Sequence, residues 1–258
     1  MKGFFIKKAF FDGWDNLLVM VAQNLIYMAI IICAIYTTGL LGEFTFLGIS
    51  ILVLLLFAES VIAGGTNHVV YNWAHYKKEG FSAFKTGIKR NFRHAVLFFF
   101  LQLLLILYVT IIIPFYSMVE GNAVTFVITV ALLWILFIFS LAFPFYFALS
   151  EHLPADRPFK TLKKCFIIMI DNIGFAVFYL FYSIICLLIS IFTLGLVPGF
   201  VGKQLASQDA VKLLMYKYDF LEEHPDERKN INWDDLLFEE KKNLGPRSLK
   251  NTIFPWKD

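Results

Sequence analysis

The sequence predicts an all-α, polytopic helical membrane protein, with about six spans in three helical hairpins and a short soluble C-terminal tail. The run 123–150 holds 28 residues without a charge, and about 20 apolar residues are enough to cross the hydrocarbon layer of a bilayer. The whole chain is 59% hydrophobic and 17% charged, whereas soluble domains are about 45–50% apolar and about 25% charged. Both observations exclude a protein whose bulk folds in water.

Hydropathy predicts where the spans lie. The first four are expected at about residues 18–40, 44–65, 95–118 and 123–149. A fifth apolar stretch, 165–202, is too long for one ordinary span, so we expect it to turn near Gly195 and to return as a sixth helix at 196–216. This helix would carry Lys203 and Asp209, which are tolerated when they face the interior of a bundle or a wet cavity. Five spans with an external tail are the alternative.

The placement of lysine and arginine predicts the orientation of these spans. Three basic residues lie before the first span, six lie at 66–93 and four lie at 151–164, whereas the short turns at the opposite ends of the spans have none. Cytoplasmic loops of membrane proteins are enriched in Lys and Arg, so we expect both termini in the cytoplasm. The turns expected outside lie near Gly42, Gly121 and Gly195.

The chain is predicted to divide into two parts. Residues 1–216 form the membrane domain, in which the connections 66–94 and 151–172 are expected to be amphipathic, and residues 217–258 form a soluble tail. Asn232 can cap a short tail helix. We expect this helix to dock on the membrane domain, and a docking surface for a partner is the alternative.

Polar residues at membrane depth are the candidate functional residues. Glu59 lies well inside the second span, where an exposed charge costs about 2.5 kcal/mol or more, so we expect it to be paired, protonated or in contact with an aqueous cavity. Lys203 is its natural partner, although the two differ in depth by about 10 Å if both helices descend from outside. A structural pair and a substrate or proton site are the two interpretations. The full candidate set is Glu59, Lys203, Asp209, Asn24 and Gln102, of which Asn24 and Gln102 are expected to form hydrogen bonds between helices.

A basic and aromatic segment precedes the third span. Its cationic residues are Lys85, Lys89, Arg90 and Arg93, and the aromatic ones are Phe81, Phe84 and Phe92. We expect this segment to be helical and to lie along anionic lipid headgroups with its phenylalanines inward. Nucleic acid is not expected as a partner.

Motifs for catalysis or metal binding are not found. His68 and His75 are seven residues apart, about 10.5 Å along a helix, so they cannot share one ion. The sequence holds no glycine-rich phosphate loop and no nucleophile elbow. We therefore predict no catalytic residue, no metal and no cofactor.

Three segments resemble one known family. They are the opening MKGFF with the entry WDNLLVMVAQNL, the segment FSAFKTGIKRNFRHAVLFF, and FPFYFALSEHLPADRPFKTLKKCFIIMIDNIG. Over about residues 1–216 the chain resembles the YesL family, bacterial membrane proteins defined by a domain of unknown function. The connection 67–80 and the tail from Asp219 look longer than the family pattern. The resemblance implies a bacterial cytoplasmic-membrane protein associated with sugar-utilisation loci beside ABC-type importers.

Two function classes are compatible with these observations. The first is a non-enzymatic accessory or scaffold associated with carbohydrate uptake, whose partners would be the lipid bilayer and an ABC-type importer or a sensor protein. The second is a small-solute transporter or channel that uses the polar residues at membrane depth.

Overall fold

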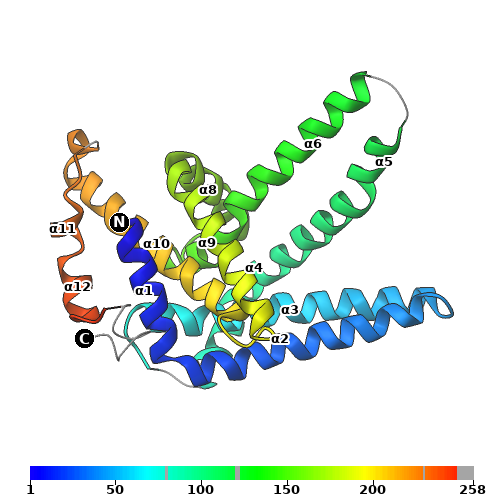
Figure 1. The fold of residues 1–258 in the computed structure, drawn as a ribbon, viewed down its shortest axis with the longest axis horizontal. Helices are drawn as coiled ribbons and strands as arrows, with labels where there is room; N and C mark the ends of the chain where they lie inside the picture. The colour runs from blue at the N-terminus through cyan, green and yellow to red at the C-terminus, as the bar shows by residue number, and fades with distance from the viewer. Residues whose placement is uncertain (79–80, 120–122, 229, 249–258) are drawn as a thin grey trace.

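The computed structural model describes residues 1–78, 81–119, 123–228 and 230–248, and every regular element in these ranges is helical. Figure 1 shows the helices. The elements of the first half are α1 (Lys2–Asp15), α2 (Leu17–Thr38), η1 (Gly39–Leu41), α3 (Thr45–Ala74), α4 (Phe81–Leu107), η2 (Tyr108–Ile112) and α5 (Ile113–Met118). Those of the second half are α6 (Ala123–Ala142), η3 (Phe143–Phe145), α7 (Tyr146–His152), α8 (Pro158–Asp171), α9 (Ile173–Phe192), α10 (Gly199–Glu223), η4 (Pro225–Glu227), α11 (Trp233–Leu236) and α12 (Phe238–Leu244).

Five helical segments of the described chain are long and apolar enough to cross a membrane. They are Leu17–Leu41, Thr45–Ala74, Phe81–Met118, Ala123–His152 and Ile173–Phe192. The predicted class, an all-α polytopic membrane protein, is therefore confirmed. The sixth helix expected at 196–216 forms as α10, which is too polar to be one of these five apolar segments.

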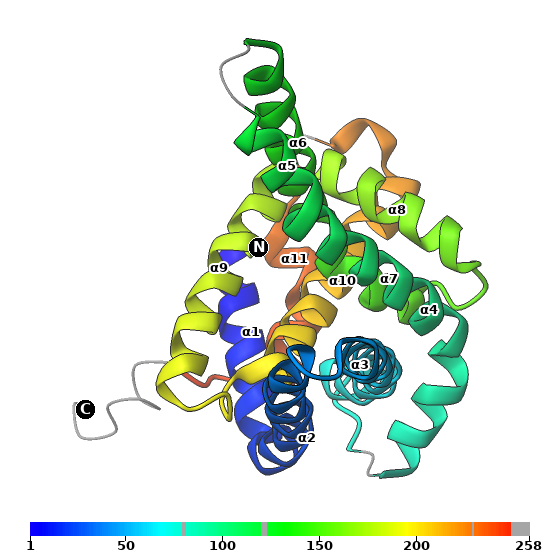
Figure 2. The same cartoon turned by 90° about the vertical axis from the view of Figure 1, so that its right-hand side faces the viewer.

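The membrane hairpins diverge from a shared base. In Figure 1 the α2 and α3 hairpin and the hairpin formed by α5 and α6 point away from the N-terminus in different directions. Helix α10 lies in the middle, and Figure 2 shows it among α1, α2, α3, α7 and α9, with each of which it packs directly. The most polar of the long helices is therefore the one that the others enclose.

Prolines interrupt two of the spans. A proline has no backbone N–H and clashes with the preceding turn, so the regular α-helical ladder cannot continue through it. The π-helical turn η2 lies immediately before the segment that contains Pro114, and the 3-10 turn η3 contains Pro144. The chain continues in helical form after both, so each span stays one long segment.

Glycines bring α3 and α4 together. A Cβ atom on Gly87 would lie 2.7 Å from the carbonyl oxygen of Gly65 and 2.5 Å from Cβ of His68. Only glycine allows the two backbones to approach this closely, as small residues do at other membrane helix interfaces. This contact fixes α3 against α4 and so sets the relative positions of Glu59 and Gln102, further along the same pair.

Most of the connection 66–94 and the start of the tail form as continuations of neighbouring helices, and the tail helix begins where it was expected. Helix α3 continues to Ala74, so the connection expected at 66–94 is mostly the end of α3 and the start of α4. Helix α10 passes the expected boundary at 216 and ends at Glu223. The tail helix begins where Asn232 was expected to cap it, since the Asn232 side chain accepts a hydrogen bond from the backbone N–H of Asp234. The predicted outer turn at Gly121 lies outside the described residues.

A candidate polar cavity at membrane depth

A cavity of about 260 Å³ lies where α3, α4, α9 and α10 meet the turn η3. Its polar lining residues are Glu59, Asn67, Gln102, Lys203, Gln204 and Ser207. Aromatic rings supply much of the remaining wall, among them Phe98, Phe147 and Tyr179. The cavity thus combines hydrogen-bonding groups with apolar faces, which is the usual composition of a small-molecule site.

Glu59 is held by its neighbours on α3 and α4. Gln102 Nε2 donates a hydrogen bond of 3.0 Å to Glu59 Oε2, and Ser60 Oγ donates one of 2.9 Å to Gln102 Oε1. The serine fixes which end of the amide faces the carboxyl group. Gln102 therefore has the interhelical role predicted for it, because it joins Glu59 on α3 to α4.

Lys203 does not pair with Glu59. Both side chains line the cavity, but no ion pair joins them among the residues that the structure describes. The predicted partnership is therefore wrong as a direct contact. The reason is the stagger of the helices, since Lys203 lies in the first turns of α10 and Glu59 lies halfway along α3.

Gln204 brings to the cavity a buried oxygen without a hydrogen-bond partner among the described residues. Its Nε2 donates a hydrogen bond of 3.1 Å to the Tyr27 hydroxyl. Its Oε1 is buried and has no hydrogen-bond partner within the described part of the chain. Buried polar atoms are nearly always hydrogen-bonded, so this oxygen is available to accept a hydrogen bond from a small polar molecule in the cavity.

Asn24 is a structural residue rather than part of the cavity. Its Nδ2 donates hydrogen bonds of 2.9 Å to the carbonyl oxygens of Leu196 and Pro198, and its Oδ1 accepts one of 3.0 Å from the N–H of Val201. The side chain uses its hydrogen-bonding capacity on the turn between α9 and α10. It thereby fixes the depth at which α10, and with it Lys203, begins.

Asp209 belongs to a separate ionic cluster at the base, which we define as Lys8, Asp12, Asp209, Lys212 and Glu240. Lys8 Nζ lies 2.6 Å from Asp12 Oδ2, 3.5 Å from Asp209 Oδ1 and 3.4 Å from Glu240 Oε2, and Lys212 Nζ lies 2.7 Å from Glu240 Oε1. All five side chains are buried. The ionic cluster therefore joins α1, α10 and α12, and Asp209 is not a residue of the membrane cavity.

Burial and neighbouring charges oppose each other in the ionic cluster. Burial lowers the pKa of Lys8, but Asp209, Asp12 and Glu240 outweigh it and the pKa lies above its usual range. Burial raises the pKa of Glu240, yet Lys8 and Lys212 bring it below its usual range. Burial raises the pKa of Asp209 well above normal, despite Lys8. The ionic cluster holds three carboxyl groups and two ammonium groups, so its net charge is zero when Asp209 carries a proton.

The basic segment before the third span is only partly as predicted. Lys85, Lys89 and Arg93 are exposed and available to lipid headgroups. Arg90 instead turns toward Glu151, with Arg90 Nε 3.3 Å from Glu151 Oε2. The phenylalanines do not all point inward, because Phe81 is 82% exposed.

Glu151 is a buried residue that sequence reasoning missed. Its carboxylate accepts a hydrogen bond of 2.5 Å from Asn91 Nδ2 and lies 3.0 Å from His68 Nδ1, in addition to Arg90. It comes directly after the uncharged run 123–150, and its position at the end of that run was the only signal. Its partners come from two other helices, so their proximity is a product of the fold.

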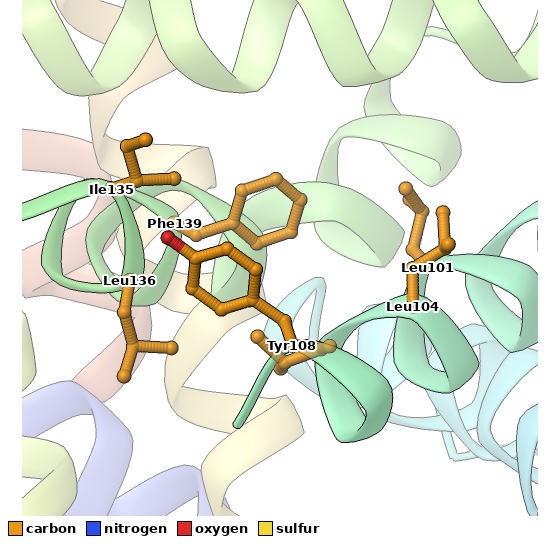
Figure 3. Close-up of a pocket in the computed structure, with 7 residues that line it drawn as sticks. Leu101, Leu104, Tyr108, Ile135, Leu136 and Phe139 are labelled. Atoms are coloured by element: carbon orange, nitrogen blue, oxygen red, sulfur yellow. The ribbon is translucent and has the colours of Figure 1, made fainter. Parts of the chain in front are cut away.

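A second pocket, between α4 and α6, is apolar. Figure 3 shows its lining, with Leu101, Leu104, Tyr108, Ile135, Leu136 and Phe139 labelled, and its volume is about 180 Å³. The Tyr108 hydroxyl donates a hydrogen bond of 2.8 Å to the carbonyl oxygen of Leu132. The lining holds no ionisable acid or base other than this phenol, so the pocket has no chemistry to offer beyond contact with an alkyl chain.

The fold and the cavity together define a polytopic α-helical membrane protein with a polar cavity among its spans. No family model, curated protein or solved structure matches the chain. The function of the protein is therefore inferred from its own residues and from their geometry.

Proposed function

We propose that the protein is a non-enzymatic membrane protein that binds a small polar solute in the cavity at Glu59 and Lys203, as a small-solute transporter or channel does. One observation supports this most directly. A carboxyl and an ammonium group face the same cavity of about 260 Å³ without pairing with each other. Polar residues at membrane depth are costly and commonly mark substrate or ion pathways.

A proteoliposome swelling assay tests this proposal. The purified full-length chain is reconstituted, and osmotic entry of glycerol, erythritol, glucose and glycine is compared with that into protein-free liposomes. We expect entry of at least one solute to be faster with protein and to be lost in the double variant Glu59→Gln, Lys203→Met. Lys89→Gln, on the exposed face of α4, serves as the control. Entry equal to that of protein-free liposomes for every solute would contradict the proposal.

A second candidate function is an accessory or scaffold for carbohydrate uptake in a bacterial cytoplasmic membrane. The arrangement of the spans favours it, because the two hairpins diverge (Figure 1) and carry exposed apolar side chains such as Leu54 and Trp134, which other membrane helices could contact. The carbohydrate part rests on the resemblance to the YesL family alone. A photo-crosslinking amino acid at Trp134, which is 61% exposed, should then form a defined adduct with the membrane subunit of an importer. If the crosslinker forms adducts with lipid only, the result would contradict this role.

A further inference from the structure

We propose that the ligand of the cavity is a single-chain amphiphile, whose polar head occupies the cavity while its alkyl chain lies in an adjoining groove. This inference rests on the function proposed above and specifies the chemical class of the ligand. It starts from the neighbourhood of Glu59, which lines two cavities of opposite character.

The second of these cavities is an apolar groove of about 370 Å³ between α2, α3 and α4. Its walls include Ile30 and Ala34 on α2, Ile49 and Val53 on α3, and Leu103 on α4. Apart from Glu59, every residue that lines it is aliphatic. From Ile49 to Glu59 the groove follows α3 for about 15 Å, at 1.5 Å per residue. This is about half the hydrocarbon thickness of a bilayer, a length suited to one alkyl chain.

Glu59 is the junction between the groove and the polar cavity. A ligand with its head beside Glu59 and its chain toward Ile49 would place the polar head against polar side chains and the alkyl chain against aliphatic ones. A purely polar solute would leave the aliphatic groove unused, and a hydrocarbon would leave the buried Gln204 Oε1 without a partner. A buried polar group without a hydrogen-bond partner destabilises the complex that leaves it so. An amphiphile is the class of molecule that satisfies both cavities.

The charges of the cavity define the head further. Glu59 and Lys203 supply one acidic and one basic group, and the other polar lining residues are neutral amides and a hydroxyl. A strongly anionic or cationic head would meet a like charge at one of them. A neutral head with several hydroxyl groups can donate to Glu59 and Gln204 and accept from Lys203. We therefore infer a neutral, hydroxyl-bearing head.

A photolabelling experiment tests this inference. The full-length protein in phosphatidylcholine nanodiscs is irradiated with a monoacylglycerol that carries a diazirine at the end of its acyl chain. Mass spectrometry then locates the adducts. We expect saturable labelling of the groove walls near Ile30 and Ile49, and we expect an excess of unlabelled monoacylglycerol to abolish it.

Two kinds of variant separate the head from the chain. Val53→Trp fills the groove, and the double variant Glu59→Gln, Lys203→Met alters the head site, and each should abolish the saturable labelling. Leu187→Trp, on the exposed face of α9, is the matched control and should label as the wild type does. Leu52→Phe is a milder groove variant for the case in which Val53→Trp fails to give a monodisperse protein.

The outcomes distinguish the inference from the function on which it rests. Uniform, unsaturable labelling of all lipid-facing helices would overturn the inference. Saturable labelling that persists in the Glu59→Gln, Lys203→Met variant would overturn it as well. Free glycerol could instead compete for labelling in a way that is lost in the Glu59→Gln, Lys203→Met variant but kept in Val53→Trp. That result would overturn the inference of an amphiphilic ligand and would support a site for a small polar solute. If neither glycerol nor monoacylglycerol competes and no solute enters the proteoliposomes, both proposals fail.

Discussion

Asn24 and Gly199 fit against each other so closely that a Cβ atom at position 199 would lie 2.4 Å from the Asn24 side-chain amide. Gly199 also has a φ of +62°, in the left-handed region that residues with a Cβ atom adopt at a cost. Both the steric contact with Asn24 and the backbone conformation therefore restrict the first residue of α10 to glycine. The contact fixes the entry of α10, and the position of Lys203 depends on it.

Replacing Gly199 by alanine should destabilise the protein by about 1–3 kcal/mol, since the change adds a steric overlap to a strained backbone conformation. The thermal unfolding of the purified protein in detergent, followed by size-exclusion chromatography, would measure the loss. Gly174→Ala is the matched control, because a Cβ atom there meets nothing within 4 Å. Equal stabilities of the two variants would contradict the prediction.

Lys8→Met should be among the most destabilising substitutions in the chain. It removes the ammonium group that Asp12, Asp209 and Glu240 share, and truncating one member of a buried ion pair costs about 3–5 kcal/mol. Lys7→Met changes the adjacent lysine, for which no ion pair is found among the described residues. The same unfolding measurement should place Lys7→Met near the wild type. A Lys8→Met protein of unchanged stability would show that the ionic cluster does not stabilise the fold.

The docking of α12 should depend on pH through Glu240. Burial raises the pKa of Glu240, but Lys8 and Lys212 outweigh burial and bring the folded pKa below its ordinary value of 4.5. The ionised carboxylate therefore stabilises the docked helix fully above that value, and this stabilisation is lost as the pH falls through the lower folded pKa. Protonation of Asp209 affects stability in the opposite direction. Its folded pKa is raised, so the folded state binds this proton more readily than the unfolded state does, and acidification through that range favours folding. Hydrogen exchange in α12, corrected for the intrinsic rate, should therefore accelerate only below about pH 4.5.

Glu240→Gln should weaken the docking of α12 at neutral pH and remove its acid transition. Glu239→Gln is the control for this experiment, because Glu239 is exposed and Glu240 is buried. Retention of the transition in Glu240→Gln would assign it to another group.

Double-mutant cycles should separate the neighbours of Glu59. The direct hydrogen bond from Gln102 should give Glu59 and Gln102 a coupling of about 0.6–2 kcal/mol, the range for polar contacts between membrane helices. Glu59 and Lys203, which share a cavity without touching, should couple more weakly. The variants Glu59→Met, Gln102→Leu and Lys203→Met, with their pairwise combinations, supply both cycles. A stronger coupling to Lys203 would restore the direct pair that the sequence predicts.

The orientation in the membrane is open to a labelling test. We expect a cysteine at Gly42 to react with a membrane-impermeant maleimide from outside the cell, and one at Asp226 to react only after permeabilisation, because basic residues flank the cytoplasmic ends of the spans. The natural Cys33, Cys165 and Cys186 would first be replaced. External reaction at Asp226 would instead place the tail outside. A cysteine at Asn251 would report on a part of the tail that lies outside the described residues.

Several parts of this structure could be predicted because they depend on local composition. A run of apolar residues long enough to cross lipid is visible in the sequence wherever it occurs, so the all-α polytopic class and the approximate spans could be inferred directly. The cap at Asn232 and the interhelical role of Gln102 could be inferred too, since each depends on one residue type in a defined local setting.

The contacts of the charged residues could not be predicted in the same way. Glu59 and Lys203 were matched by charge, but a direct pair also requires equal depth, and that depth is fixed by the contact of Asn24 with the turn before α10. Arg90 looked like a lipid-facing cation because its partner Glu151 is 61 residues away in the chain.

The sequence by itself determined which segments are apolar enough to leave water and where the charges lie along them. The tertiary structure decided which charges meet. It placed Asp209 with Lys8 and Glu240 in the base and left Glu59 and Lys203 facing one cavity. The physical reason is that burial in lipid depends on the composition of a segment of about 20 residues, whereas an ion pair depends on the relative position of two helices to within an ångström or two.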